Sequence, residues 1–238
     1  MKTLFIIPAR GGSKGIPRKN VRNFCGKPLI TRSVEQALAL SDAEDICVTT
    51  DDPEIAEAAA GAGVSIPFMR PAELAGDTTP SRNVLLHALD FYSAHNADYD
   101  RIVLLQPTSP LRNIEDIRNC IAAYDKGWAE GLNPDMAVCV TEAEANPYYN
   151  AFEPDENGML HVSKGAGSYT RRQDAPKVWQ YTGAVYVINA DSLRKMQMSA
   201  FPRIIPVEMP RERGVDLDTE ADWMLAEYLF KEAEKKKE

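Results

Sequence analysis

A cationic, glycine-rich segment near the N-terminus carries the residue types best suited to chemistry. An apolar run over residues 6–9 leads into RGGSKGIPRKN at residues 10–20. The first 34 residues contain eight Lys or Arg and no Asp or Glu, although the net charge of the chain is −8. Glycines let backbone N–H groups approach phosphate oxygens closely, and consecutive amides form anion-binding nests. The segment therefore predicts a polyphosphate site, with a mobile glycine–serine turn as the alternative. Four cations without counter-charges would repel one another in a purely structural turn, which favours the anion site.

Two carboxylates near the C-terminus could complement that segment. Asp216 and Asp218 are two residues apart, so in an extended chain both side chains project from one face. Side-by-side carboxylates repel unless a cation lies between them, and Mg²⁺ (or Mn²⁺) is a hard, oxygen-seeking ion that also bridges phosphates. The alternative is a solvated acidic turn that caps the following helix. The metal interpretation gains support from the phosphate segment, because polyphosphate chemistry uses a metal to neutralise charge.

Two further segments carry polar groups in restrained settings. Prolines at 107 and 110 fix the backbone of QPTSPLR (106–112), so Gln106, Thr108 and Ser109 would be presented at defined angles. This suits recognition of hydroxyl groups, and a rigid structural turn explains it equally well. Arg171 and Arg172 could clamp a carboxylate in bidentate fashion, or belong to a surface charge run.

The elements that must position these residues alternate between strands and helices. Apolar runs predict strands at residues 3–8, 45–50, 64–68, 101–105, 136–141 and 183–188, and helical periodicity predicts helices at 29–40, 53–61, 80–92 and 114–124. The capping boxes Asn113/Asp116 and Thr219/Asp222 open the 114–124 helix and a terminal helix. In the terminal helix we expect an inward face of Ala221, Met224, Leu225, Tyr228 and Leu229.

This alternation indicates an α/β fold with a mostly parallel sheet covered by helices on both faces. Ligands in such folds collect beyond the carboxyl ends of the strands. The segments at 10–20, 49–52 and 106–112 should therefore share one rim of the sheet.

Length and composition limit the organisation and the class of protein. The 238 residues predict a single domain over residues 1–238, with an inserted excursion at approximately 142–181 that carries turn signals and a hairpin. The acidic balance argues against a nucleic-acid partner. No membrane partner is expected, because the first apolar run is too short for a signal or a span, and this favours the cytoplasm. The four cysteines and three histidines show no metal-ligand spacing.

Taken together, these segments resemble the acylneuraminate cytidylyltransferases, also called CMP-sialic acid synthetases. The matching segments are colinear over nearly the whole chain: PARGGSKGIPRKN (8–20), GKPLI (26–30), TTD (49–51), RPAELA (70–75), QPTSPL (106–111), RRQD (171–174) and DLDTE (216–220). The resemblance implies a nucleotide-diphospho-sugar transferase-like, three-layer α/β/α fold. It also implies CTP and Mg²⁺, and a homodimer in which the excursion crosses to the partner and helps to close its pocket.

The resemblance also implies roles for individual residues. Lys19, Arg10 and Asp218 would be catalytic, with Lys19 stabilising charge on the α-phosphoryl group. Asp216 and Asp218 would hold the metal, one of them also accepting the acceptor's hydroxyl proton. The implied nucleotide-binding residues are Ala9, Arg10, Gly12, Ser13, Asn20 (ribose), and Arg70, Thr79 and Ser81 (cytosine).

On the acceptor side, Gln106 would contact the sugar and Arg172 its carboxylate. Trp179, Tyr181 and Phe201 are candidates for acceptor or dimer contacts, with ordinary core or hairpin packing as the alternative.

The implied activity is transfer of CMP from CTP to the 2-hydroxyl of a nine-carbon α-keto acid sugar, a nonulosonic acid, with release of pyrophosphate. CMP-KDO synthetases carry a different, glycine-poor first loop, so the resemblance points to the nine-carbon branch. The alternatives are a nucleotidyltransferase for another acceptor (KDO or a sugar 1-phosphate) and a non-catalytic CTP-binding protein. The residues leave the acceptor open among N-acetylneuraminate, Kdn, legionaminate and pseudaminate.

Overall fold

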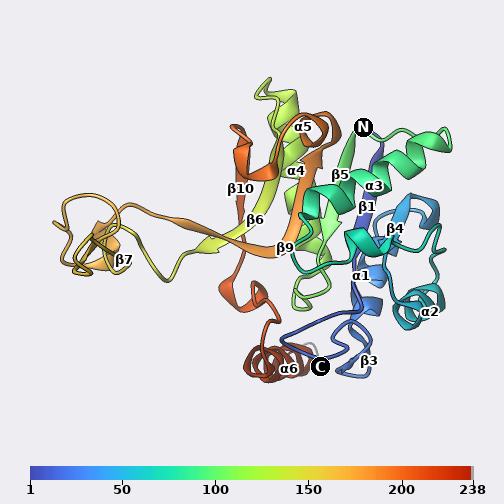
Figure 1. The fold of residues 1–238 in the computed structure, drawn as a ribbon, viewed down its shortest axis with the longest axis horizontal. Coiled ribbons are helices and arrows are strands. Elements are labelled where there is room, and N and C mark those ends of the chain that lie inside the picture. The colour runs from blue at the N-terminus through green and yellow to red at the C-terminus, as the bar shows by residue number, and fades with distance from the viewer. Residues whose placement is uncertain (237–238) are drawn as a thin grey trace.

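A six-stranded, mostly parallel sheet forms the centre of the computed structural model, which describes residues 1–236 (Figure 1). The strand order is β10-β6-β9-β5-β1-β4, and β9 alone among these six strands runs antiparallel to its neighbours. The strands are β1 (Thr3–Pro8), β4 (Ile46–Thr49), β5 (Arg101–Leu105), β6 (Met136–Glu142), β9 (Trp179–Asn189) and β10 (Ile204–Glu208). The predicted mostly parallel α/β sheet is confirmed.

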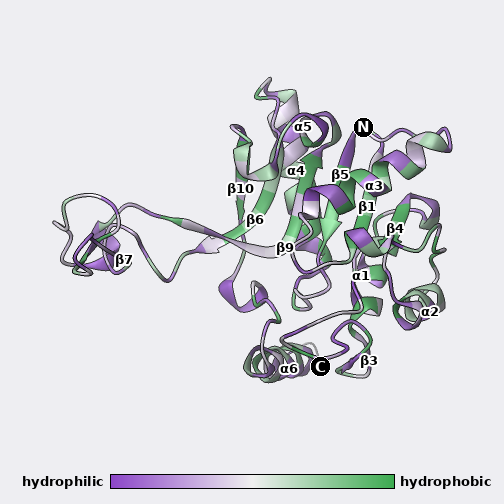
Figure 2. Cartoon of the chain, in the orientation of Figure 1, coloured by the Kyte–Doolittle hydropathy of each residue, from purple (hydrophilic) through white to green (hydrophobic). Residues whose placement is uncertain are grey.

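Helices cover both faces of this sheet and produce three layers. One core joins the sheet to α1 (Leu29–Leu38), α2 (Pro53–Gly61) and α4 (Ile114–Ala129). A second core joins the opposite face to α3 (Ser81–Ala94) and α5 (Ala190–Lys195). Burial on both faces explains why the inner strands are nearly continuous apolar runs, which Figure 2 shows in green. Short 3-10 turns lie at Ala43–Asp45, Ala72–Leu74, Arg172–Asp174, Met198–Ala200 and Arg211–Arg213.

The carboxyl ends of the parallel strands share one rim, and the candidate segments emerge there. β1 pairs with β4 through Pro8 and Thr49, and the chain after β1 stays attached because the Ala9 N–H donates to the Thr49 carbonyl at 3.0 Å. The segments at 10–20, 49–52 and 106–112 follow β1, β4 and β5, as the sequence predicts.

A third, small core fastens the C-terminal helix to the N-terminal segment. The helix α6 (Glu220–Lys235) packs on Phe24 of β2 (Asn23–Phe24), the strand that pairs with β3 (Lys27–Pro28). Trp223 meets Phe24 edge to face with ring centroids 5.4 Å apart, and Ile16 and Leu217 are buried in the same core. Both capping boxes are present. This core therefore brings the segments around residues 10–20 and 216–218 together, although they are about two hundred residues apart.

The predicted inward face of the terminal helix is wrong. Trp223 and Ala226 are buried, whereas Met224, Leu225 and Tyr228 are exposed, Tyr228 at 61%. Ala221 is also exposed, and Leu229 is half-buried. Apolar residues occur on more than one side of this helix, and the aromatic surface of Phe24 selects the Trp223 side.

The predicted strand at residues 64–68 is absent. Val64 is buried, but Pro67 lacks the N–H group that a ladder would need. The segment runs along the body and rejoins it where the Arg70 N–H donates to the Thr50 carbonyl at 2.7 Å. The other predicted elements are present with shifted ends: α4 continues to Ala129, and β9 begins at Trp179 rather than at residue 183.

Between β6 and β9 the chain leaves the body as a projecting arm, residues 143–178 (Figure 1). The arm carries the hairpin of β7 (Phe152–Pro154) and β8 (Leu160–Val162), whose turn uses Gly158 at φ +79°. The hairpin expected in the excursion is thus present. Over residues 1–236, no helix is both long and apolar enough to cross a membrane.

Candidate active site

A cavity of about 290 Å³ opens at the rim of the sheet. Its walls come from the segment after β1, from the stretch between Arg70 and the start of α3, and from the turn after β5. The catalytic candidate Lys19 lines it together with six of the eight residues expected to bind nucleotide: Arg10, Ser13, Asn20, Arg70, Thr79 and Ser81. Ala9 is buried behind this lining and Gly12 is exposed.

Two glycines allow the cationic segment to lie against its neighbours. A Cβ on Gly11 would fall 2.5 Å from a carboxylate oxygen of Asp52, and one on Gly15 would fall 2.0 Å from the Asp218 carbonyl oxygen. The Gly11 N–H donates to Asp51 at 3.0 Å, so this aspartate positions the segment. The glycines at 11 and 15 are therefore required for close approach.

Gly15→Ala should separate the cationic segment from residue 218. The added methyl cannot fit 2.0 Å from a backbone oxygen, so the segment must shift. We expect kcat to fall at least tenfold with a small change in the thermal unfolding midpoint, measured by pyrophosphate release and calorimetry. Gly12→Ala is the matched control, because a Cβ there meets no atom within 4 Å. Equal activity of the two variants would show that the close approach of residue 15 to the Asp218 carbonyl is not needed for activity.

Lys19 links the two ends of the chain within the cavity. Its side chain is buried, and its Nζ donates to the carbonyl oxygen of Leu217, which lies between Asp216 and Asp218 in the sequence. Burial lowers the pKa of Lys19, while the charges of Asp218 and Asp216 oppose that shift. A buried ammonium close to two carboxylates is thus fixed at the edge of the cavity.

Asp216 is exposed at the level of the whole residue, and neighbouring atoms nonetheless shield part of its carboxylate from water. Burial raises its pKa, and the nearby Asp218 charge acts in the same direction. A hydrogen bond from the Thr108 side chain favours the charged form, and the Leu217 N–H donates to the Thr108 carbonyl at 2.9 Å. The turn after β5 therefore orients this aspartate.

The donor set at Asp216 and Asp218 fits a hard divalent cation. Two neighbouring carboxylates, one of them with a raised pKa, would be stabilised by positive charge between them. Within residues 1–236 no group of three or more His, Cys, Asp and Glu side chains could form a complete metal cage. Two carboxylates complemented by phosphate oxygens and water are a typical Mg²⁺ environment.

The opposite wall carries polar groups suited to a nucleoside. Arg70 is buried and donates from Nε to the Thr49 hydroxyl at 3.1 Å and from its other end to the Thr49 carbonyl. Asn20 donates to the Arg10 carbonyl at 3.0 Å, while its buried Oδ1 has no partner within the described part of the chain. An unpaired buried acceptor that lines a cavity can accept a hydrogen bond from a ligand hydroxyl.

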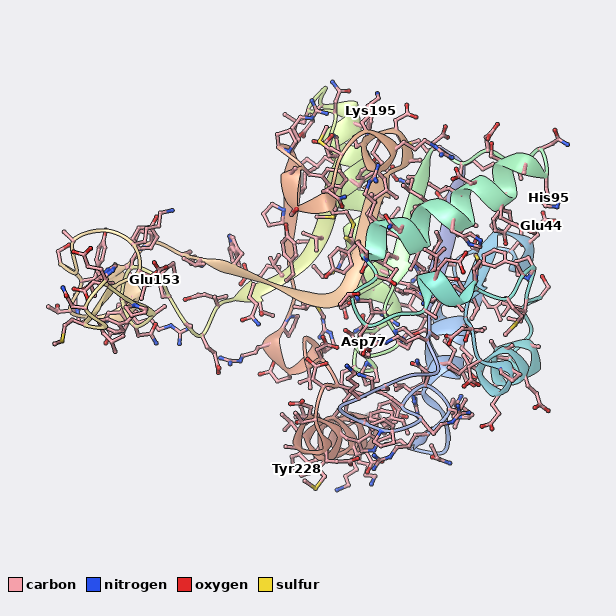
Figure 3. All side chains as sticks on the ribbon, viewed as in Figure 1. Glu44, Asp77, His95, Glu153, Lys195 and Tyr228 are labelled. Atoms are coloured by element: carbon pink, nitrogen blue, oxygen red, sulfur yellow. The ribbon has the colours of Figure 1, made fainter. Side chains whose placement is uncertain are left out.

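Sequence reasoning missed Asp77, and it also treated the four cations as uncompensated. Asp77 lines the cavity (labelled in Figure 3), with one carboxylate oxygen 2.5 Å from the Arg10 guanidinium and the other paired with Lys14. Arg18 pairs with Asp52 and Glu54. The counter-charges come from separate segments of the chain, so charge counting within residues 1–34 could not reveal them.

Asp77→Asn should tighten CTP binding, because the Asp77 carboxylate occupies cations that phosphates would need. Solvent-exposed ion pairs are weak, so we expect a Kd lower by a few-fold, up to about fivefold. Calorimetric titration at low and high salt measures this, and the difference from wild type should shrink as salt rises. Weaker CTP binding by the variant would show that Asp77 supports the nucleotide site instead of competing for it.

The residues expected to contact the acceptor lie in three different settings. Gln106 and Tyr181 line a second cavity that adjoins the first. Phe201 is buried in the core, and Trp179 packs at its edge. Arg172 is exposed at the base of the arm, where it donates to the Ala143 carbonyl at 2.8 Å, and it lines neither of these cavities.

Arg112 is a buried support that sequence reasoning did not single out. Its guanidinium donates to the carbonyls of Gln106 at 3.0 Å and Ala184 at 2.7 Å, and to the Ser33 hydroxyl at 2.6 Å. Burial lowers the pKa of Arg112 to about 10. It fixes the turn that presents Gln106.

The fold and the cavity define an α/β nucleotide-binding protein in which a cationic loop faces two aspartates. The cytidylyltransferase family model matches residues 4–212, so the chain belongs to the cytidylyltransferase family, a class of nucleotidyltransferase enzymes. It is 33% identical over 231 residues to the pseudaminic acid cytidylyltransferase of Campylobacter jejuni subsp. jejuni, with 97% of each chain covered. It is 29% identical to the CMP-N,N'-diacetyllegionaminic acid synthase of Legionella pneumophila subsp. pneumophila, again with 97% of each covered.

Comparison with solved structures supports the same fold. The CMP:2-keto-3-deoxy-manno-octonic acid synthetase complexed with CTP superposes with a TM-score of 0.68 at 20% identity, over 98% of this chain and all of the other. The nucleotide-diphospho-sugar transferase-like fold is thereby confirmed.

Proposed function

We propose that this protein transfers CMP from CTP to the 2-hydroxyl of a nonulosonic acid and releases pyrophosphate. The observation that carries the proposal is the Lys19 ammonium, bound to the carbonyl between Asp216 and Asp218 beside a cation-lined cavity. The names of the relatives support the acceptor class, since both refer to acids of this type.

The chain's own residues bind and orient CTP in this proposal. Arg10, Ser13 and the backbone amides of the loop hold the phosphates. The unpaired Oδ1 of Asn20 accepts a hydrogen bond from a ribose hydroxyl. Arg70 and Ser81 line the region available to the cytosine. In this proposal the buried Lys19 ammonium is a preorganised cation that neutralises charge developing on the α-phosphoryl group.

At the α-phosphorus, one bond forms and one breaks, and one proton is transferred. The acceptor 2-hydroxyl attacks the α-phosphorus, the bond between the α-phosphorus and the bridging oxygen breaks, and the electron pair leaves with pyrophosphate. The hydroxyl proton passes to one of the two aspartates. Asp216 and Asp218 would hold Mg²⁺, which supplies charge neutralisation on the phosphates when bound.

In this proposal Arg172 contacts the acceptor only in a homodimer. It lines neither of the two adjoining cavities described above, and the arm that carries it projects from the body. In a homodimer the arm of one chain would bring Arg172 to the acceptor carboxylate in the other. Mixing inactive Arg172→Ala with inactive Asp218→Asn protein should then restore part of the activity, because some mixed dimers would contain one intact site. No recovery, with a dimer verified by sedimentation, would place Arg172 outside the partner's site.

The direct test measures pyrophosphate released from CTP and Mg²⁺ with N-acetylneuraminate, Kdn, legionaminate and pseudaminate, with KDO and UTP as controls. We expect turnover with at least one nonulosonate and CTP, and little with UTP. Turnover with KDO or a sugar 1-phosphate alone would favour the alternative in which the protein is a nucleotidyltransferase for another acceptor. CTP binding without turnover on any acceptor would indicate a binding protein.

A further inference from the structure

The two aspartates of the candidate site lie on a segment without regular secondary structure. Residues 214–218 follow the 3-10 turn Arg211–Arg213 and precede the cap of α6, and they belong to neither a helix nor a strand. Such a segment has no ladder of backbone hydrogen bonds to fix its side chains. The directions of the Asp216 and Asp218 carboxylates therefore depend on individual contacts at each end of the segment.

Both ends of the segment are anchored. At the C-terminal end, Leu217 donates its N–H to the Thr108 carbonyl at 2.9 Å, and its own carbonyl accepts from the Lys19 Nζ. At the N-terminal end, Arg213 donates from Nε to Asp116 Oδ2 at 2.9 Å and from Nη2 to Asp116 Oδ1 at 2.8 Å. A planar guanidinium that binds both oxygens of a carboxylate is fixed in direction as well as in distance.

Asp116 is a firm point of attachment for this anchor. Its side chain is 3% exposed, and it lies in the first turn of α4. Its Oδ2 also accepts the Asn113 N–H at 3.0 Å as part of the capping box, and Asn113 directly follows the turn after β5. The Arg213–Asp116 pair therefore ties the segment to the same turn that orients Asp216 through Thr108.

The sheet restrains the segment from another side. A Cβ on Gly214 would lie 2.9 Å from Thr182 Cγ2 and 3.2 Å from Thr141 Cγ2, so the backbone directly after Arg213 lies against β9 and β6. This contact blocks movement toward the sheet, and the Arg213–Asp116 pair restrains the segment from the side of α4. Asp216 follows Gly214 by two residues, so little freedom is left for its backbone.

We propose that Arg213 is a positioning residue, which acts through Asp116 to hold Asp216 and Asp218 in the arrangement that binds the metal. The proposal rests on the proposed function, in which these two aspartates hold Mg²⁺. An ion pair without such a role would stabilise the fold and leave metal binding unchanged. Removing a group that orients metal ligands from outside typically costs about 10- to 100-fold in metal affinity or activity.

The first test uses Asp116→Asn, which removes the negative charge but keeps an oxygen that can accept the Asn113 N–H. Water-proton relaxation measures the Kd for Mn²⁺ with CTP present and no acceptor, so this readout needs no turnover. We expect that Kd to rise about tenfold and kcat for pyrophosphate release to fall about tenfold or more. CTP affinity in EDTA should be unchanged.

Arg213→Lys is the second variant, and it leaves a positive charge near the buried carboxylate. An ammonium cannot reproduce the paired bonds of the guanidinium. The Kd for Mn²⁺ should therefore rise severalfold, with a smaller loss of thermal stability than in Asp116→Asn.

Asp135→Asn is the matched control for a purely structural ion pair. The Asp135 side chain is 1% exposed and accepts from Arg203 Nη2 at 2.8 Å. It directly precedes β6, so it lies at the opposite end of the sheet from the candidate site. We expect Asp135→Asn to lower the unfolding midpoint about as much as Asp116→Asn does, with the Kd for Mn²⁺ and kcat unchanged.

The outcomes separate this proposal from the proposed function. Wild-type Mn²⁺ affinity in either folded variant, or an equal loss of affinity in Asp135→Asn, would overturn the role of Arg213. If the wild-type protein binds Mn²⁺ with CTP but releases no pyrophosphate with any nonulosonate, the proposed function alone fails, and the Mn²⁺ comparison still decides the role of Arg213. Failure of the wild-type protein to bind Mn²⁺ with CTP would overturn both the metal site and the positioning role.

Discussion

Lys19→Ala should lower kcat about a thousandfold while leaving the fold intact. The Lys19 ammonium is fixed on the Leu217 carbonyl near two carboxylates, so its loss removes a buried, positioned charge. Removing one such preorganised group typically costs 10²- to 10³-fold in kcat. Steady-state pyrophosphate release gives kcat, and calorimetric titration separates the effect on CTP binding.

Two controls distinguish a catalytic role for Lys19 from a structural one. Lys14→Ala removes a cation from the same loop, but that side chain is 81% exposed and pairs with Asp77. We expect it to change kcat less than tenfold. Lys19→Arg should recover little, because the buried setting fits an ammonium rather than the wider guanidinium. Near-normal turnover by Lys19→Ala would reject the assigned role.

Asp216→Asn should abolish most turnover and at the same time stabilise the protein at neutral pH when metal is chelated. The first effect follows from loss of a charged oxygen ligand, and we expect a fall in kcat of about 10³-fold. The second follows from the raised pKa of Asp216, because burial and the Asp218 charge disfavour its ionised form in the folded state.

The pH dependence of that stabilisation has a defined sign. A carboxyl whose pKa is raised on folding binds its proton more tightly in the native state, so its contribution to stability is present at acid pH. It is lost as pH rises from the ordinary aspartate value through the raised native value. The unfolding midpoint of Asp216→Asn in EDTA should therefore exceed that of wild type at pH 7, and this advantage should vanish at acid pH.

Asp222→Asn is a control on the same segment for which we expect the opposite change in stability at pH 7. The Thr219 hydroxyl and the N–H groups of Thr219 and Asp218 lower the pKa of Asp222, so its charge stabilises the native state above the ordinary aspartate pKa. We expect a lower unfolding midpoint at pH 7 and a smaller loss of kcat. Destabilisation of both variants at neutral pH would contradict the account of Asp216.

Much of the site could be predicted from local patterns, because each part is encoded within a short segment. The glycines and cations of residues 10–20 favour a phosphate site, and the pair Asp216 and Asp218 favours a metal site, before any contact is known. Both assignments stay predictions. The rim position of the segments after β1, β4 and β5 follows from strand–helix alternation alone.

The parts that escaped prediction depend on tertiary contacts. Asp77 meets Arg10 across 67 positions in sequence, and no local signal marks it as a counter-ion. The orientation of α6 was misjudged because the aromatic surface of Phe24 selects Trp223 over the Met224 side. The strand predicted at residues 64–68 is absent because Pro67 cannot donate to a strand ladder, although the segment has the apolar composition of a strand. The second cavity, which adjoins the nucleotide cavity, is lined by Met136 and Met198 from separate elements, so neither residue is marked by a local sequence signal.

A crystal structure with CTP and Mn²⁺ tests the central claim most directly, since anomalous scattering locates the metal independently of the phosphates. We predict the metal in contact with Asp216 and Asp218, the triphosphate along residues 10–20, and the Lys19 Nζ within hydrogen-bond distance of an α-phosphate oxygen. A metal peak distant from both aspartates, or a triphosphate bound away from the Lys19 ammonium, would contradict the account.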